Sequence, residues 1–142
     1  MRHIDLIVVH CSATRADKRY SVLQLIRDHR DRFGFTGYHY YITRDGLTYR
    51  TRHEQFIGAH AKGYNKHSIG VCYEGGLDAK GQPCDTRTKR QKIVLLALLQ
   101  RLVAEHPGAR IVGHRDLPGV NKACPCFDCS EYADLQSPQP AP

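Results

Sequence analysis

The chain has 142 residues, which suits one compact domain, and 41% of them are hydrophobic, enough to form a core. No apolar stretch approaches the ~20 residues that span a bilayer, so we expect no membrane insertion. The formal net charge of +7 favours an anionic partner, which could be a nucleic acid, a membrane surface or an acidic cell-wall polymer. The sequence has none of the usual nucleic-acid-binding motifs, so we expect no specific nucleic-acid partner.

The first predicted element is a strand at residues 5–10 (DLIVVH). Its continuous apolar run between polar flanks is typical of a central strand that is buried on both faces. The run is too short for the apolar region of a secretory signal peptide. We therefore expect synthesis in the cytoplasm without a signal peptide.

A helix and a hairpin are predicted next. Ser21 is placed to cap a helix whose apolar residues recur on one face, and Gly34 is placed to end it. Residues 38–43 and 47–51 predict two strands, and the Asp-Gly pair between them is a strong signal for a hairpin.

The second half of the chain predicts two further strands and a long helix. Residues 68–73 (SIGVCY) and 110–113 (RIVG) have the composition of strands, and 88–105 is the clearest helix, ended by His-Pro-Gly. A short helix is expected to begin near Asp128.

This order of elements predicts an α/β fold, in which a central mixed β-sheet is flanked by helices. We assign residues 1–136 to a single domain and 137–142 (SPQPAP) to a proline-rich tail. We expect the protein to be a monomer.

Six cysteines in a chain without a signal peptide favour reduced thiols or metal ligands over a disulfide framework. Cys11 and Cys72 lie in apolar, strand-like segments, and we interpret both as buried free thiols that pack like small hydrophobic residues.

A metal site is predicted where two strands end. His10 ends the first strand, and His114 follows the last one. If these strands are parallel neighbours, both imidazoles emerge at the carboxyl edge of the sheet, where open α/β sheets place their ligands. The following loop would return a cysteine to the same place, ten positions after His114. Three protein ligands leave the fourth position of a tetrahedral zinc site open for water, as in catalytic sites.

Two other interpretations of the cysteine-rich segment remain open at this point. Cys124, Cys126 and Cys129, together with His114, would form a closed structural zinc site, a kind of site that favours several thiolates. Alternatively, two of these cysteines would form a disulfide, which the expected compartment disfavours.

Five motifs together resemble one enzyme family. They are VVHCSAT at 8–14, GYHYYITRDG at 37–46, HAKGYNKHSIGVCYEGG at 60–76, GHRDL at 113–117 and KACPCFD at 122–128. In this order they resemble the zinc-dependent N-acetylmuramoyl-L-alanine amidases of the small phage lysozyme type, which are relatives of the peptidoglycan recognition proteins. The resemblance covers almost the whole chain.

The resemblance implies a mixed sheet, one Zn²⁺ ion, and hydrolysis of the amide bond between N-acetylmuramic acid and L-alanine in bacterial peptidoglycan. It implies that His10, His114 and Cys124 are the zinc ligands and that Tyr38 and Lys122 are catalytic. Tyr38 would donate a hydrogen bond or pass a proton. A phage or prophage endolysin of this kind acts on the cell wall after release or delivery.

The loop HAKGYN supplies candidate substrate-binding residues. His60, Lys62 and Asn65 would line the groove for glycan or peptide, because loops on a rigid scaffold often carry binding groups. The alternative interpretation of this loop is a turn held by Gly63 and Asn65.

Two functions other than hydrolysis are kept as alternatives. In the first alternative, the chain is a binding module that holds peptidoglycan without cutting it. The absence of one metal ligand from the sequence would identify such a module. In the second alternative, the chain regulates a phage RNA polymerase by contacting it through the basic surface, as some phage relatives do.

Overall fold

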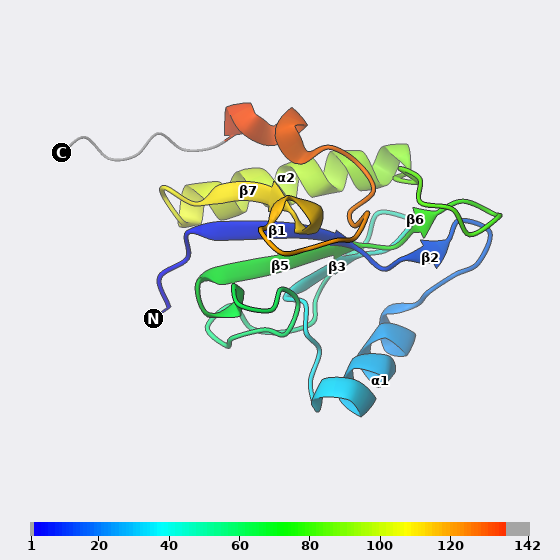
Figure 1. The fold of residues 1–142 in the computed structure, drawn as a ribbon, viewed down its shortest axis with the longest axis horizontal. Helices are drawn as coiled ribbons and strands as arrows, with labels where there is room; N and C mark the ends of the chain where they lie inside the picture. The colour runs from blue at the N-terminus through cyan, green and yellow to red at the C-terminus, as the bar shows by residue number, and fades with distance from the viewer. Residues whose placement is uncertain (1, 136–142) are drawn as a thin grey trace.

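The computed structural model of the protein describes residues 2–135. A five-stranded sheet forms the centre of the molecule, and the sheet lies between the helices (Figure 1). In sheet order its strands are β4 (Thr48–Arg50), β3 (Tyr40–Ile42), β5 (Ser68–Tyr73), β1 (Leu6–Cys11) and β7 (Arg110–Gly113). All neighbours are parallel except β3 and β4, which pair antiparallel. The predicted mixed sheet is confirmed.

β1 is the strand that determines where the chemistry lies. All six of its residues are buried, as its apolar sequence predicts, and it runs parallel to β5 on one side and β7 on the other. Val9 is in register with Gly113, so the carboxyl ends of β1 and β7 lie side by side. The residues that follow these two strands therefore meet at one edge of the sheet.

The two helices, α1 (Val22–Phe33) and α2 (Lys89–Glu105), cover opposite faces of the sheet (Figure 1). Alternate residues of β1 pack with α2 in the main core, whereas α1 buries only Leu25, which packs with Tyr41 and Cys72. Much of the α1 face is therefore left for the pocket described below. No helix among the described residues combines the length and apolarity needed to cross a membrane.

The predicted helix ends are confirmed. The Ser21 hydroxyl accepts a hydrogen bond from the Gln24 N–H, and Gly34 ends α1 in the left-handed conformation. Thr88 and Gln91 form a capping box at the start of α2.

Several short elements complete the fold. β2 (Thr14–Arg15) pairs with β6 (Gly76–Leu77), and the 3₁₀ helices are η1 (Asn65–His67), η2 (His114–Asp116) and η3 (Cys129–Leu135). The short helix expected near residue 128 is η3, which contacts β7 and α2. The sequence missed the β2–β6 pair because two residues leave no periodic pattern. The predicted tail at 137–142 lies outside the described residues.

A buried arginine joins η3 to the start of α2. The Arg87 side chain is 3% exposed, and its guanidinium contacts the carboxylates of Asp85 and Glu131 at 2.9 and 2.8 Å. It also donates to the Tyr132 hydroxyl and lies 3.4 Å from the centre of the Phe127 ring. One cation thus holds the C-terminal helix against the domain.

We expect Arg87→Met to lower the free energy of unfolding by about 2–3 kcal/mol, because several charge-assisted hydrogen bonds are lost at once. The loss is limited because Asp85 and Glu131 are 34% and 48% exposed and regain water. Urea denaturation measures the change, with the exposed Arg90→Met as the matched control. Equal stability of the two variants would contradict the role given to Arg87.

Candidate metal centre and pocket

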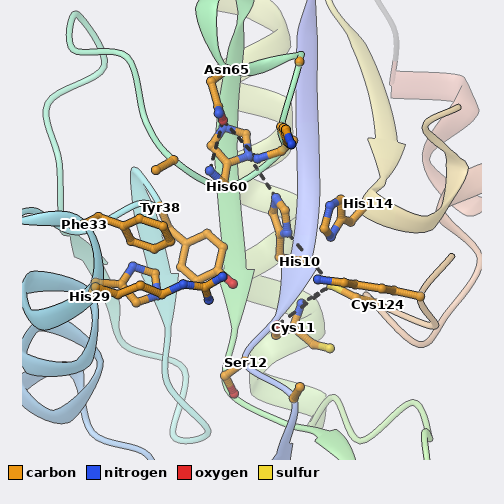
Figure 2. A pocket seen from close by; sticks show the side chains of 17 residues that line it. His10, Cys11, Ser12, His29, Phe33, Tyr38, His60, Asn65, His114 and Cys124 are labelled. Carbon is orange, nitrogen blue, oxygen red and sulfur yellow. Dashed lines mark hydrogen bonds between the residues drawn. The ribbon is translucent and has the colours of Figure 1, made fainter. Parts of the chain in front are cut away.

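Three side chains converge at the carboxyl edge of the sheet (Figure 2). His10 comes from β1, His114 begins η2 directly after β7, and the next loop brings in Cys124. One ligand atom of each lies within 4.8 Å of the other two, and the Cys124 Sγ is 3.9 Å from the His10 Nδ1. The structure thus brings together the three residues that the sequence predicts as ligands.

These residues suit a metal ion in their chemistry as well as in their spacing. The Nδ1 atom of His114 is buried and has no hydrogen-bond partner among the described residues. Burial, with added repulsion from His60 and His114, lowers the pKa of His10 well below its usual value, so its imidazole is neutral, the form that binds metal. The Cys11 N–H donates to the Cys124 Sγ at 3.3 Å, which helps to fix the position of the sulfur. Two imidazoles and a thiolate match the ligands that zinc prefers.

The loop that carries Cys124 is fixed against β5 and β7. The Arg115 N–H donates to the Cys124 carbonyl at 2.8 Å, and the Tyr73 hydroxyl donates to the Pro125 carbonyl at 2.6 Å. A Cβ on Gly113 would lie 2.8 Å from the Pro125 Cδ, so only glycine lets this loop approach β7 so closely. The sulfur ligand is therefore held in place by backbone contacts.

The two neighbouring cysteines are directed elsewhere. The Cys126 Sγ lies 3.9 Å from the Cys11 Sγ, and Cys129 is buried in the main core. All six cysteines are free. Neither the closed cluster of His114 with Cys124, Cys126 and Cys129 nor a disulfide is formed among the described residues.

A pocket of about 630 Å³ opens over the three ligands, and both predicted catalytic residues line it. The Tyr38 ring centre is 5.0 Å from that of His10. Burial, reinforced by nearby thiols, raises the pKa of Tyr38 well above its usual value, so its hydroxyl keeps the proton. Lys122 lies close enough that its charge helps to lower the pKa of His114, after the larger effect of burial.

The profile of one protein family, described as N-acetylmuramoyl-L-alanine amidase, matches residues 1–127. The chain belongs to this amidase family. It is 40% identical to the endolysin of Klebsiella phage KP32 over 127 residues, covering 89% of this chain and 83% of that protein. It is also 40% identical to the endolysin of Escherichia phage T7 over 129 residues, covering 90% and 84%.

A solved structure of an N-acetylmuramoyl-L-alanine amidase has the same fold. The amidase LysC from Clostridium intestinale URNW superposes with a TM-score of 0.78 at 27% identity, covering 96% of this chain and 88% of that one. The amidase fold therefore accounts for nearly the whole described domain.

The HAKGYN loop places its three predicted residues in the wall of the pocket, at different depths. Lys62 is exposed at the rim. Asn65 turns inwards, and its Oδ1 accepts hydrogen bonds from two backbone N–H groups of the loop at 3.0 and 2.9 Å, as in the alternative interpretation of a turn. His60 is only 8% exposed, and its two ring nitrogens contact His10 at 2.9 Å and Ser68 at 3.1 Å.

One wall of the pocket was not foreseen. His29, Arg32 and Phe33 of α1 line it opposite the metal ligands (Figure 2). The His29 Nδ1 accepts the Gly37 N–H at 2.8 Å, and its ring centre is 5.0 Å from that of Tyr38. The spacing of 29, 32 and 33 on one helix face was the available signal, but the sequence alone did not show that this face borders a cavity.

A second group of potential ligands, Glu54, Glu105 and His106, lies outside this pocket. The Glu54 carboxylate already accepts hydrogen bonds from the Tyr40 hydroxyl and from His106, and Glu105 pairs with Arg101 at 3.7 Å. We interpret this group as a structural network.

Proposed function

We propose that this protein is a zinc-dependent amidase that hydrolyses the bond between N-acetylmuramic acid and L-alanine in bacterial peptidoglycan. The observation that carries this proposal is the convergence of His10, His114 and Cys124 at the floor of a large pocket, in a chain of the amidase family. The relatives named endolysin support the same substrate. As an endolysin, the protein would act as a monomer on the cell wall, after synthesis in the cytoplasm and release or delivery.

The roles of the pocket residues follow from what each side chain offers. His10, His114 and Cys124 would hold Zn²⁺, which when bound supplies a Lewis acid that polarises the amide carbonyl and acidifies a water molecule. Attack on the amide develops negative charge on the carbonyl oxygen. The protonated Tyr38 hydroxyl would donate a hydrogen bond to this oxygen, and Lys122 would supply a positive charge.

The charge of the pocket suits the peptide part of the substrate. Arg32, Lys62 and Lys122 line it, and none of its lining residues is an aspartate or glutamate. Peptidoglycan stem peptides carry free carboxylates, so we propose that Lys62 and Arg32 bind the stem at the rim. Asn65 contributes by fixing the backbone of the loop that carries Lys62.

Release of new amino termini from purified sacculi tests the proposal. We expect the protein to free L-alanine amino groups, to lose this activity with a zinc chelator, and to regain it when zinc is added back, because the chemistry depends on the metal. Heat-denatured protein, which has no activity, serves as the control. Tight binding to sacculi without cleavage at any zinc concentration would favour a binding module instead, although the complete ligand set argues against one.

A further inference from the structure

We propose that His60 is a positioning residue, which holds the His10 imidazole in the tautomer and orientation that direct Nδ1 towards His114 and Cys124. The inference rests on the proposed zinc-dependent function and gives His60 a role other than contact with the substrate. It is carried by hydrogen bonds on both nitrogens of His60 and by the way the fold makes room for its ring.

The hydrogen bonds allow one consistent assignment of protons. The Nδ1 of His10 faces Cys124 at 3.9 Å, and a nitrogen that binds a metal has no proton. The proton of His10 must then lie on Nε2, which is 2.9 Å from the His60 Nδ1 and donates to it. His60 therefore carries its own proton on Nε2 and donates to the Ser68 hydroxyl at 3.1 Å. Each ring nitrogen of His10 and His60 thus has one role, as metal ligand, hydrogen-bond donor or hydrogen-bond acceptor.

The fold fixes His60 from two sides. Its backbone N–H donates to the Asn65 Oδ1 at 3.0 Å, which anchors the loop. Its ring lies against the backbone of β5 at Gly70, where an added Cβ would be 2.6 Å from the His60 Cγ. A side chain at position 70 would displace the ring, so glycine in this strand is required by the position of His60.

This arrangement differs from that expected of a substrate-binding residue. Both ring nitrogens already have protein partners, and the side chain is almost fully buried in the wall of the pocket. Partners of this kind fix the ring of a ligating histidine, and their removal typically weakens metal affinity or activity by about 10–100-fold. Loss of His60 should therefore be detected first in zinc binding.

Zinc affinity of purified variants, measured by competition with a chromogenic chelator, tests the proposal. We expect His60→Leu, which keeps the volume but not the hydrogen bond, to raise the Kd for zinc by about 10–100-fold. His60→Asn should recover most of this loss, because its Oδ1 offers an acceptor near the position of the imidazole Nδ1. His53→Leu, which removes an exposed histidine, is the control and should bind zinc as the wild type does.

A second variant tests the same contact with His60 still in place. Gly70→Ala should displace the ring and weaken zinc binding in a similar way, so the test does not depend on the folding of His60→Leu. In the zinc-free wild type, ¹⁵N NMR should find the proton of His10 on Nε2, and His60→Leu should lose this preference.

The outcomes separate this inference from the proposed function. Folded His60→Leu protein with wild-type zinc affinity and a raised KM for muropeptide would overturn the positioning role and favour substrate contact. Failure of the wild-type protein to bind zinc at all would overturn the proposed function, and this inference with it.

Discussion

Cys124→Ala is expected to abolish hydrolysis of sacculi, with a fall in kcat/KM of at least about 10³-fold, which corresponds to about 4 kcal/mol. The reason is that this substitution removes the sulfur from a group of three ligands whose atoms lie within 4.8 Å of one another. Two imidazoles alone would hold zinc weakly and in the wrong geometry. Zinc content by mass spectrometry and release of amino termini measure the two effects together.

Cys126→Ala is the matched control, because it removes a thiol of the same loop two positions further on. The Cys126 sulfur faces Cys11, so we expect this variant to keep its zinc and its activity. The pair therefore distinguishes the open site from the closed cysteine cluster. A loss of zinc in both variants, or in Cys126→Ala alone, would contradict the assignment of Cys124.

The location of the metal centre was predictable because it depends on strand ends. A continuous apolar run predicted β1, and a second short strand was predicted before His114. That the two strands are parallel neighbours was the condition of the prediction, and the structure shows that they are. Residues that follow such strands must meet at one edge, whatever the details of packing. The choice of Cys124 over Cys126 was different, since spacing alone left it open and only the resemblance of KACP to the family motif decided it.

The support of His10 was not predictable from the sequence. His60 belongs to a loop motif that indicated a pocket, but its contact with His10 joins residues 50 positions apart. That contact also depends on Gly70, whose missing side chain leaves space for the ring. A glycine inside a predicted strand indicates that another group packs closely against the backbone there, but it does not indicate which group. The pocket wall formed by α1 was missed for the same reason. The periodicity of a helix predicts which residues share one face, but it does not predict what that face contacts.

Tyr38→Phe is expected to lower kcat by about 10²–10³-fold, as the loss of one oxyanion donor does. The phenyl ring keeps the packing beside His10 and His29, so zinc affinity and KM should remain near the wild-type values. Lys122→Met should lower kcat by a similar factor, and Lys122→Arg should keep part of the activity because the charge remains. Steady-state kinetics on a soluble muropeptide, with zinc content measured on each sample, checks this expectation.

The pH dependence of these variants distinguishes a hydrogen-bond donor from a group that passes protons. Because burial raises the pKa of Tyr38, its hydroxyl stays protonated at every pH below its already high usual value, and it contributes no limb to the profile near neutrality. If Tyr38 only donates a hydrogen bond, Tyr38→Phe should lower the rate by the same factor at each pH and leave the shape of the profile unchanged. A lost or displaced limb in Tyr38→Phe would instead mean that Tyr38 exchanges a proton during the reaction. In that case the pH profile of the wild-type enzyme would include the titration of Tyr38. The raised pKa of the buried Tyr38 hydroxyl argues against such a titration near neutral pH.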